Sequence, residues 1–178
     1  MMARSRSDPL LLGEWACLGV LYAGPSHGFA IAGELKPDGE LGRIWSMSRA
    51  LTYRALDQLS AAGLIHSVGE EPGIAGGNRT VLAITRSGRS RFRDWVTTPV
   101  EHLRDLRSEL LLKIVLGERC SIDIAEMLEQ QRHRVAAAAA AFDHNTGDVV
   151  DLWRTEFAYG ALAFLDRVID GADDPTVS

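Results

Sequence analysis

Hydrophobic residues recur every three to four positions through most of the chain, a spacing that predicts amphipathic helices. One stretch departs from it: two short runs rich in β-branched residues flank a glycine-rich segment, which predicts a β-hairpin. Prolines, glycines and capping residues mark the ends of the elements. The pattern predicts helices at 10–22, 27–35, 46–62, 86–98, 106–117, 122–142 and 149–171, and strands at 64–71 and 79–85.

Helix, helix, turn, helix, hairpin, helix is the element order of a winged helix-turn-helix, whose third helix enters the DNA major groove. We therefore expect a mainly α protein with a small β-hairpin. A DNA-binding winged helix-turn-helix domain is expected at 1–98 and an all-α dimerisation and effector domain at 99–178. The apolar stripes of the second domain are too extensive to be buried within it, which favours a homodimer. A monomeric three-helix bundle packed on the winged domain is the alternative.

The third predicted helix has the residue types that duplex DNA requires. Its spacing places Leu51, Ala55 and Leu59 on one face and Arg49, Thr52 and Tyr53 on the other. An arginine pairs with guanine or a phosphate, and hydroxyl groups donate to phosphates. An arginine after the glycine-rich tip can reach a neighbouring phosphate. We expect DNA contacts from Arg43, Ser46, Ser48, Arg49, Thr52, Tyr53, Arg54, Asn78 and Arg79.

The charge is distributed unevenly. The net charge is -5, which argues against indiscriminate nucleic-acid binding. Residues 1–98 nevertheless carry 11 Lys and Arg against 9 Asp and Glu, whereas residues 99–178 carry 8 against 15. This acidic balance keeps open a winged-helix adaptor that binds proteins and no DNA. A mobility shift on the DNA upstream of its own reading frame would separate the two hypotheses.

The ends of the chain and its cysteines indicate a cytoplasmic protein. Residues 1–9 carry Arg4 and Arg6 but no apolar run with a cleavage site, and no stretch is long and apolar enough to span a bilayer. We expect no membrane association. Cys17 and Cys120 both lie in apolar helical segments, and we expect both to be buried free thiols.

Enzyme and metal-sensor hypotheses have less support. The sequence has no glycine-rich phosphate loop, no Gly-x-Ser-x-Gly and no His-Glu-x-x-His. His27 is expected to cap or pack against the start of its helix. Cys120, Asp123 and His133 are imaginable metal ligands, but their spacing matches no standard site. We expect no enzyme activity, cofactor or metal.

Several motifs resemble the PadR family of transcriptional regulators. Residues 19–31 resemble its opening signature, with a Pro-x-His-Gly-aromatic core at Pro25–Phe29. Residues 45–56 are similar to the start of its recognition helix, and the following Leu59 and residues 62–65 also match the family. Residues 77–88 resemble its wing and Leu-Thr-x-x-Gly ending. Arg107–Lys113 resembles the segment that opens the C-terminal domain of the longer subfamily. The motifs cover about residues 10–116, and only the helix pattern continues the resemblance to residue 170.

The resemblance implies a homodimer, formed by the C-terminal helices and the first helix, that represses transcription from a palindromic operator. It also implies a phenolic or other small aromatic effector, for which Trp15, Trp95 and Trp153 are the expected contacts. Two departures weaken the expected phosphate contacts: Asp57 replaces a basic residue, and Thr80–Leu82 replaces a basic-aromatic stretch. Thr52 also separates Leu51 from Tyr53, which are adjacent in the family. We expect modest affinity that falls steeply with salt.

Overall fold

The computed structural model describes residues 9–72, 77–141 and 148–172. The chain forms two compact units, one built from the residues up to Val96 with Leu111–Ile122, the other from Thr97–Leu110 with the residues after Ile122. The mainly α fold with a small antiparallel sheet is confirmed. Among the residues that the structure describes, no helix is long and apolar enough to cross a membrane.

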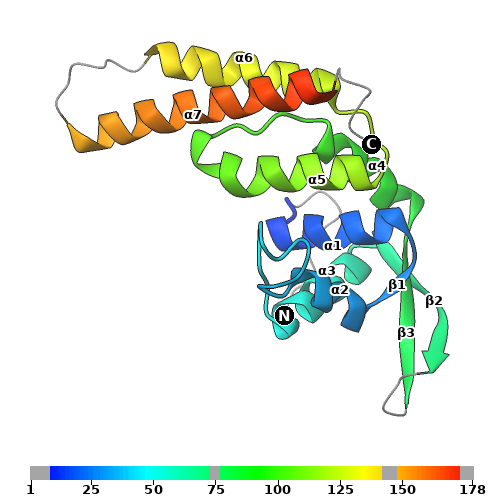
Figure 1. Ribbon diagram of the computed structural model, residues 1–178. Helices are drawn as coiled ribbons and strands as arrows, with labels where there is room; N and C mark the ends of the chain where they lie inside the picture. Colours follow the sequence, from blue (N-terminus) through cyan, green and yellow to red (C-terminus); the bar gives the residue numbers. More distant parts are fainter. Residues whose placement is uncertain (1–8, 73–76, 142–147, 173–178) are drawn as a thin grey trace. The chain divides into compact units, whose positions relative to one another are not determined.

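The first unit has the element order of a winged helix-turn-helix, with one further helix (Figure 1). Its elements are α1 (Leu12–Ala23), β1 (Ser26–His27), α2 (Gly28–Leu35), α3 (Arg49–Ala61), β2 (Ile65–Pro72), β3 (Asn78–Ile84), α4 (Arg86–Val96) and α5 (Leu111–Arg119). Side-chain caps begin three of these helices. His27 caps α2, as expected, Ser48 caps α3, and the Thr85 hydroxyl accepts from the Gly88 backbone N–H at the start of α4.

The sheet has one strand more than the sequence predicts. Its order is β1-β3-β2, and all neighbours are antiparallel. Ser26 pairs with Leu82 in β3, and Ile65 pairs with Ile84. The missed strand, β1, is two residues long, too short for any alternation of polar and apolar residues to appear. It joins the start of α2 to the wing formed by β2 and β3.

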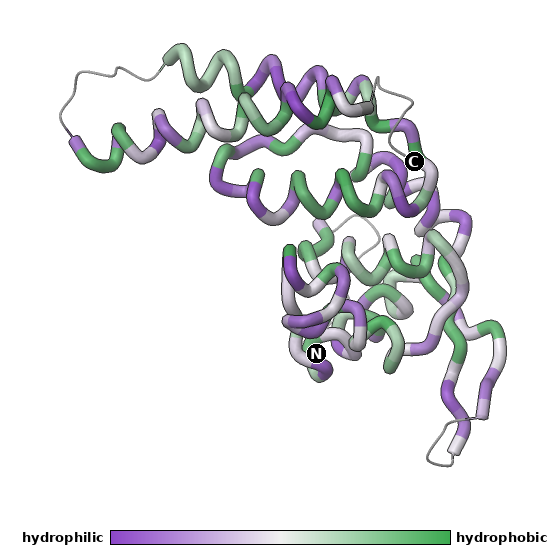
Figure 2. The backbone as a smooth tube through the Cα atoms, viewed as in Figure 1, coloured by the Kyte–Doolittle hydropathy of each residue, from purple (hydrophilic) through white to green (hydrophobic). Residues whose placement is uncertain are grey.

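The core of the first unit surrounds α1, which Figure 2 shows as largely hydrophobic. Cys17 and Leu18 are completely buried. Helix α5 approaches α1 closely at Gly19, where a Cβ atom would lie 2.5 Å from Cδ1 of Leu116. Arg119 at the end of α5 makes a bidentate ion pair with Glu34 of α2, which raises the pKa of Arg119. These contacts place α5 in the first unit, although it follows residue 98 in the sequence.

The two thiols are free and differ in exposure. Cys17 is buried as expected, whereas Cys120 is only half-buried, with its Sγ 3.5 Å from the Gly19 carbonyl oxygen. Burial, helped by the nearby Glu14, raises the pKa of Cys17 to about 12. Burial also raises the pKa of Cys120, against the opposing charges of Arg119 and Arg89.

We predict that Cys17 resists thiol reagents at pH 8 until the first unit unfolds, because the reactive species is the thiolate. The time course of Ellman's reaction on Cys120→Ser, with and without denaturant, measures this. Rapid labelling of that variant without denaturant, at the rate of an exposed thiol, would contradict the packing around α1.

The second unit is a helical pair preceded by two short turns. The 3₁₀ turn η1 (Leu103–Asp105) and the π-helical turn η2 (Leu106–Leu110) precede α6 (Ala125–Ala141) and α7 (Val149–Ala172). The helix predicted at 106–117 is therefore α-helical only from Leu111. Helices α6 and α7 lie side by side (Figure 1), and the Arg132 guanidinium of α6 donates to the Asp166 carboxylate of α7. The buried Gln131 side chain bonds both backbone groups of Val100.

Candidate nucleic-acid interface

Helix α3 presents its first turn to solvent. Ser48 accepts the Leu51 backbone N–H through its hydroxyl, at 3.2 Å, and Arg49 is the first helical residue. The first turn contains no acidic residue, although helix N-termini favour negative charge. Arg49, Tyr53 and Arg54 are exposed. The start of α3 therefore carries positive charge both from its backbone and from an arginine, which suits an anionic partner.

The predicted faces of α3 need one correction. Thr52, expected at the DNA contact face, is completely buried, and its hydroxyl donates to the Ser48 carbonyl at 3.1 Å. Leu51, expected in the core, is 52% exposed. The buried face consists of Thr52, Ala55, Leu56 and Leu59. The expectation failed because the threonine hydroxyl is satisfied within its own helix, so burying this side chain leaves no unpaired polar group.

Two arginines converge on one exposed aromatic ring. The Phe29 side chain, at the start of α2, is 48% exposed. The Arg49 guanidinium carbon lies 5.2 Å from the centre of the Phe29 ring, and that of Arg79 lies 4.8 Å from it. Arg49 also lies 5.8 Å from the Tyr53 ring centre. Cation–π contacts at these distances hold both guanidinium groups at one surface while leaving their N–H donors available.

Gly28 allows α2 and α3 to meet beneath these arginines. A Cβ atom at Gly28 would lie 2.8 Å from Cε1 of Tyr53 and 3.3 Å from Cδ1 of Leu56. Glycine at this position lets the Tyr53 ring lie against the start of α2. Helix α3 and the start of α2, which carries the Phe29 ring, are thus positioned relative to each other by direct packing.

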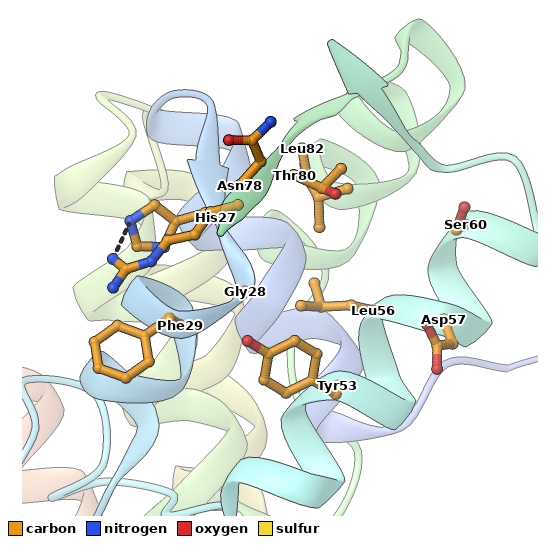
Figure 3. Close-up of a pocket in the computed structure, with 11 residues that line it drawn as sticks. His27, Gly28, Phe29, Tyr53, Leu56, Asp57, Ser60, Asn78, Thr80 and Leu82 are labelled. Atoms are coloured by element: carbon orange, nitrogen blue, oxygen red, sulfur yellow. Dashed lines mark hydrogen bonds between the residues drawn. The ribbon is translucent and has the colours of Figure 1, made fainter. Parts of the chain in front are cut away.

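A pocket of about 430 Å³ lies between α3 and the wing (Figure 3). His27, Phe29, Tyr53, Asn78 and Arg79 are among the lining residues. Asp57 also lines the pocket, and in Figure 3 it lies at the opposite end from His27 and Phe29. The acidic residue noted in the sequence therefore faces the pocket at the end away from His27 and Phe29.

Two of the expected DNA contacts, Asn78 and Arg79, lie on the wing and differ in exposure and in hydrogen-bond partners. Arg79 is half-buried against the Phe29 ring. The exposed Asn78 amide donates to the Glu70 carboxylate at 2.6 Å. Glu70 and Glu71 are both exposed on β2. Figure 2 shows the hairpin becoming more hydrophilic toward its tip, at 73–76, which lies outside the described residues. Arg79 is the cation of the described wing best placed for a phosphate.

The remaining expected DNA contacts lie elsewhere on the first unit. Arg43 is exposed on the segment that joins α2 to α3. Ser46 and Arg54 line a second, more apolar groove of about 660 Å³. That groove lies between the start of α1 and α3 and is also lined by Leu11, Trp45, Met47 and Leu51. The structure therefore brings Tyr53, Asn78 and Arg79 to one pocket. Arg49 lies against the Phe29 ring at this pocket, and Arg43, Ser46 and Arg54 lie outside it.

The three tryptophans proposed for effector binding fall in two units. In the first unit Trp15 of α1 stacks on Trp95 of α4, with ring centres 4.9 Å apart and planes 7° from parallel. The Lys113 ammonium lies 5.0 Å from the Trp95 ring centre. In the second unit Trp153 is 69% exposed and stacks on Phe157.

Two of the imagined metal ligands, Asp123 and His133, lie within hydrogen-bond distance of backbone groups two to four residues away. The Asp123 carboxylate accepts the Ala125 backbone N–H at 3.0 Å, and Nδ1 of His133 lies 2.9 Å from the Glu129 carbonyl oxygen. Within residues 9–72, 77–141 and 148–172, no three His, Cys, Asp or Glu side chains are grouped for a metal ion.

Sequence reasoning missed Phe29 and His27 as parts of this surface. Both belong to the Pro-x-His-Gly-aromatic core, but His27 was assigned only a capping role and Phe29 none. An exposed aromatic residue directly after a helix start was the available signal. Its significance depends on Arg49 and Arg79, which lie 20 and 50 residues further along the chain.

In comparison with known proteins, residues 17–94 match the model of a family described as "Transcriptional regulator PadR-like family". No curated protein matches the chain. Among solved structures, Bacillus subtilis PadR in complex with operator DNA is 18% identical with a TM-score of 0.49, over 90% of this chain and 99% of that one. The protein smu.1604c from Streptococcus mutans UA159 is 17% identical with a TM-score of 0.45, over 92% and 97%. The PadR-like regulator BC1756 from Bacillus cereus is 20% identical with a TM-score of 0.39, over 90% and 98%.

Proposed function

We propose that this chain, whose residues 17–94 match the PadR-like family of transcriptional regulators, is a homodimeric repressor that binds a palindromic operator. The observation that carries the proposal is the convergence of Arg49 and Arg79 on the exposed Phe29 ring. One arginine comes from the start of α3 and the other from the wing, the two elements that a winged helix-turn-helix applies to DNA. Arg49 is assigned to base readout and Arg79 to the phosphate backbone.

Footprinting the purified protein on the DNA that flanks its own reading frame tests this function. A repressor gives a protected, two-fold symmetric site whose affinity falls with salt. Absence of protection on every fragment, with the protein folded, would favour the adaptor hypothesis.

The dimer is proposed to form through α7. Its outer side chains include Val149, Leu152, Trp153 and Phe164, all exposed. An apolar stripe of this length is costly to leave in water, and a second copy of the same stripe covers it with matching chemistry. A single recognition helix contacts few base pairs, so pairing two subunits also supplies the affinity that one lacks.

We predict that Trp153→Glu yields a monomer in sedimentation equilibrium and binds the palindrome more weakly, because it places a charge within the stripe. The matched control is Glu156→Gln, which lies on the same outer face and removes a charge where Trp153→Glu adds one, and it is expected to remain dimeric. If Trp153→Glu remained dimeric and bound the palindrome with wild-type affinity, the assignment of the interface to this stripe would be wrong.

The effector is proposed to be a small aromatic molecule that stacks on the tryptophans, with the Trp15–Trp95 pair as the main site. Two nearly parallel indole rings with an ammonium group nearby form a surface suited to a flat aromatic ring. Binding there is proposed to change the spacing of the recognition helices in the dimer. Repeating the footprint with aromatic compounds that bind the protein tests this, and unchanged DNA affinity across all of them would reject it.

A further inference from the structure

The hydrogen bonds of His27 determine which ring nitrogen carries its proton. The Nδ1 atom accepts the Ala30 backbone N–H at 3.0 Å, as the N-cap of α2. A nitrogen that accepts a hydrogen bond has a free lone pair, so in the neutral ring the proton is on Nε2. His27 therefore presents a donor on the side of its ring away from the helix.

This donor faces another donor. The Nε2 atom of His27 lies 3.5 Å from Nη1 of Arg79, a contact drawn as the dashed line in Figure 3. An arginine guanidinium has five N–H donors and no acceptor, so the two groups cannot satisfy each other. Apart from the cap bond from the Ala30 N–H to His27 Nδ1, neither side chain has another hydrogen-bond partner among the described residues. Both side chains line the pocket between α3 and the wing. The arrangement lacks an acceptor, and a negatively charged one fits best beside Arg79.

We infer that His27 Nε2–H and the Arg79 guanidinium together bind one phosphate of the DNA backbone, an inference that rests on the proposed function. An oxyanion between the two nitrogens accepts from both and resolves the donor–donor contact. Phe29 holds Arg79 at this position through the 4.8 Å ring contact, and β1, which contains His27, pairs with β3 beside it. His27 is thereby assigned a direct role at the DNA in addition to its helix cap.

The inference is tested by His27→Ser, since serine keeps the N-cap hydroxyl but has no donor that reaches Arg79. On the footprinted duplex we expect a loss of affinity of about tenfold, as for a hydrogen bond to a charged group. The salt dependence is expected to stay as in the wild type, because a neutral donor releases no counterion, whereas Arg79→Ala lowers the slope by about 0.9. His66→Ser, an exposed histidine of β2 outside the pocket, is the matched control with wild-type affinity.

If His27→Ser binds DNA with wild-type affinity, the inference is overturned. It is also overturned if the loss of DNA affinity is accompanied by a lower melting temperature of the protein, because His27 then acts only as the N-cap of α2. Titration with inorganic phosphate, followed through the His27 ring proton resonances, separates this inference from the proposed function. We expect phosphate to shift the His27 resonances of the wild type and to leave those of Arg79→Ala unchanged. If phosphate shifts these resonances but the protein binds no duplex, the proposed DNA-binding function is wrong and the anion site at His27 and Arg79 still stands. Absence of a shift in the wild type would reject the anion site.

Discussion

Replacing Arg49 with alanine is expected to weaken operator binding by about 1–3 kcal/mol and to relax the preference for particular bases. Arg49 is exposed at the first position of α3, with its guanidinium held between the Phe29 and Tyr53 rings. A guanidinium held in place loses little conformational entropy when it pairs with guanine O6 and N7. Fluorescence anisotropy with the footprinted duplex and single-base variants of it measures both effects.

Arg79→Ala is the matched comparison, because the two arginines contact the same ring from different elements. Its loss of affinity is expected to be similar for all duplex sequences and to appear mainly as a smaller salt dependence. If Arg79→Ala instead relaxed base preference while Arg49→Ala weakened all sequences alike, the roles assigned to the two arginines would be reversed.

Replacing Phe92 with alanine is expected to lower the free energy of unfolding of the first unit by about 3–5 kcal/mol. Phe92 of α4 is completely buried, and its ring lies 5.2 Å from that of Tyr22 in α1 and 5.8 Å from that of Trp95. Truncation removes a large apolar group from between α1 and α4 and leaves a cavity that the surrounding helices fill only in part. Urea unfolding followed by circular dichroism measures the change.

Phe29→Ala provides the control for both experiments. Its ring is half-exposed, so its loss is expected to change the free energy of unfolding much less than that of Phe92. The DNA affinity of Phe29→Ala is expected to fall, however, because the variant lacks the ring that positions Arg49 and Arg79. Equal losses of stability in the two phenylalanine variants would contradict the description of the core.

The elements of this fold are predictable because most of them are amphipathic and well delimited. His27 begins its helix with a side-chain cap, as expected, and Ser48 does the same for α3. The prediction was less accurate where tertiary contacts override periodicity. Hydrophobicity alone assigns Leu51 to the core and Thr52 to the surface, yet the Thr52 hydroxyl bonds within its helix and Leu51 lines an apolar groove beside Trp45.

The candidate site was predictable in its charges and not in its geometry. Arg49 and Arg79 were expected at the DNA because of their places in the element order. Their meeting on Phe29 depends on the packing of α2 against α3 at Gly28 and on the pairing of β1 with β3. A strand of two residues leaves no periodic signal, so the position of His27 beside Arg79 required the folded structure.

The central claim is that the surface bearing Arg49 and Arg79 binds duplex DNA by sequence. Selection of duplexes from a random pool, carried out in parallel with the wild type and with the Arg49→Ala, Arg79→Ala double variant, tests it most directly. We expect the wild type to enrich a two-fold symmetric sequence and the folded double variant to enrich none. Enrichment of the same sequence by both proteins, or of no sequence by the wild type, would contradict it.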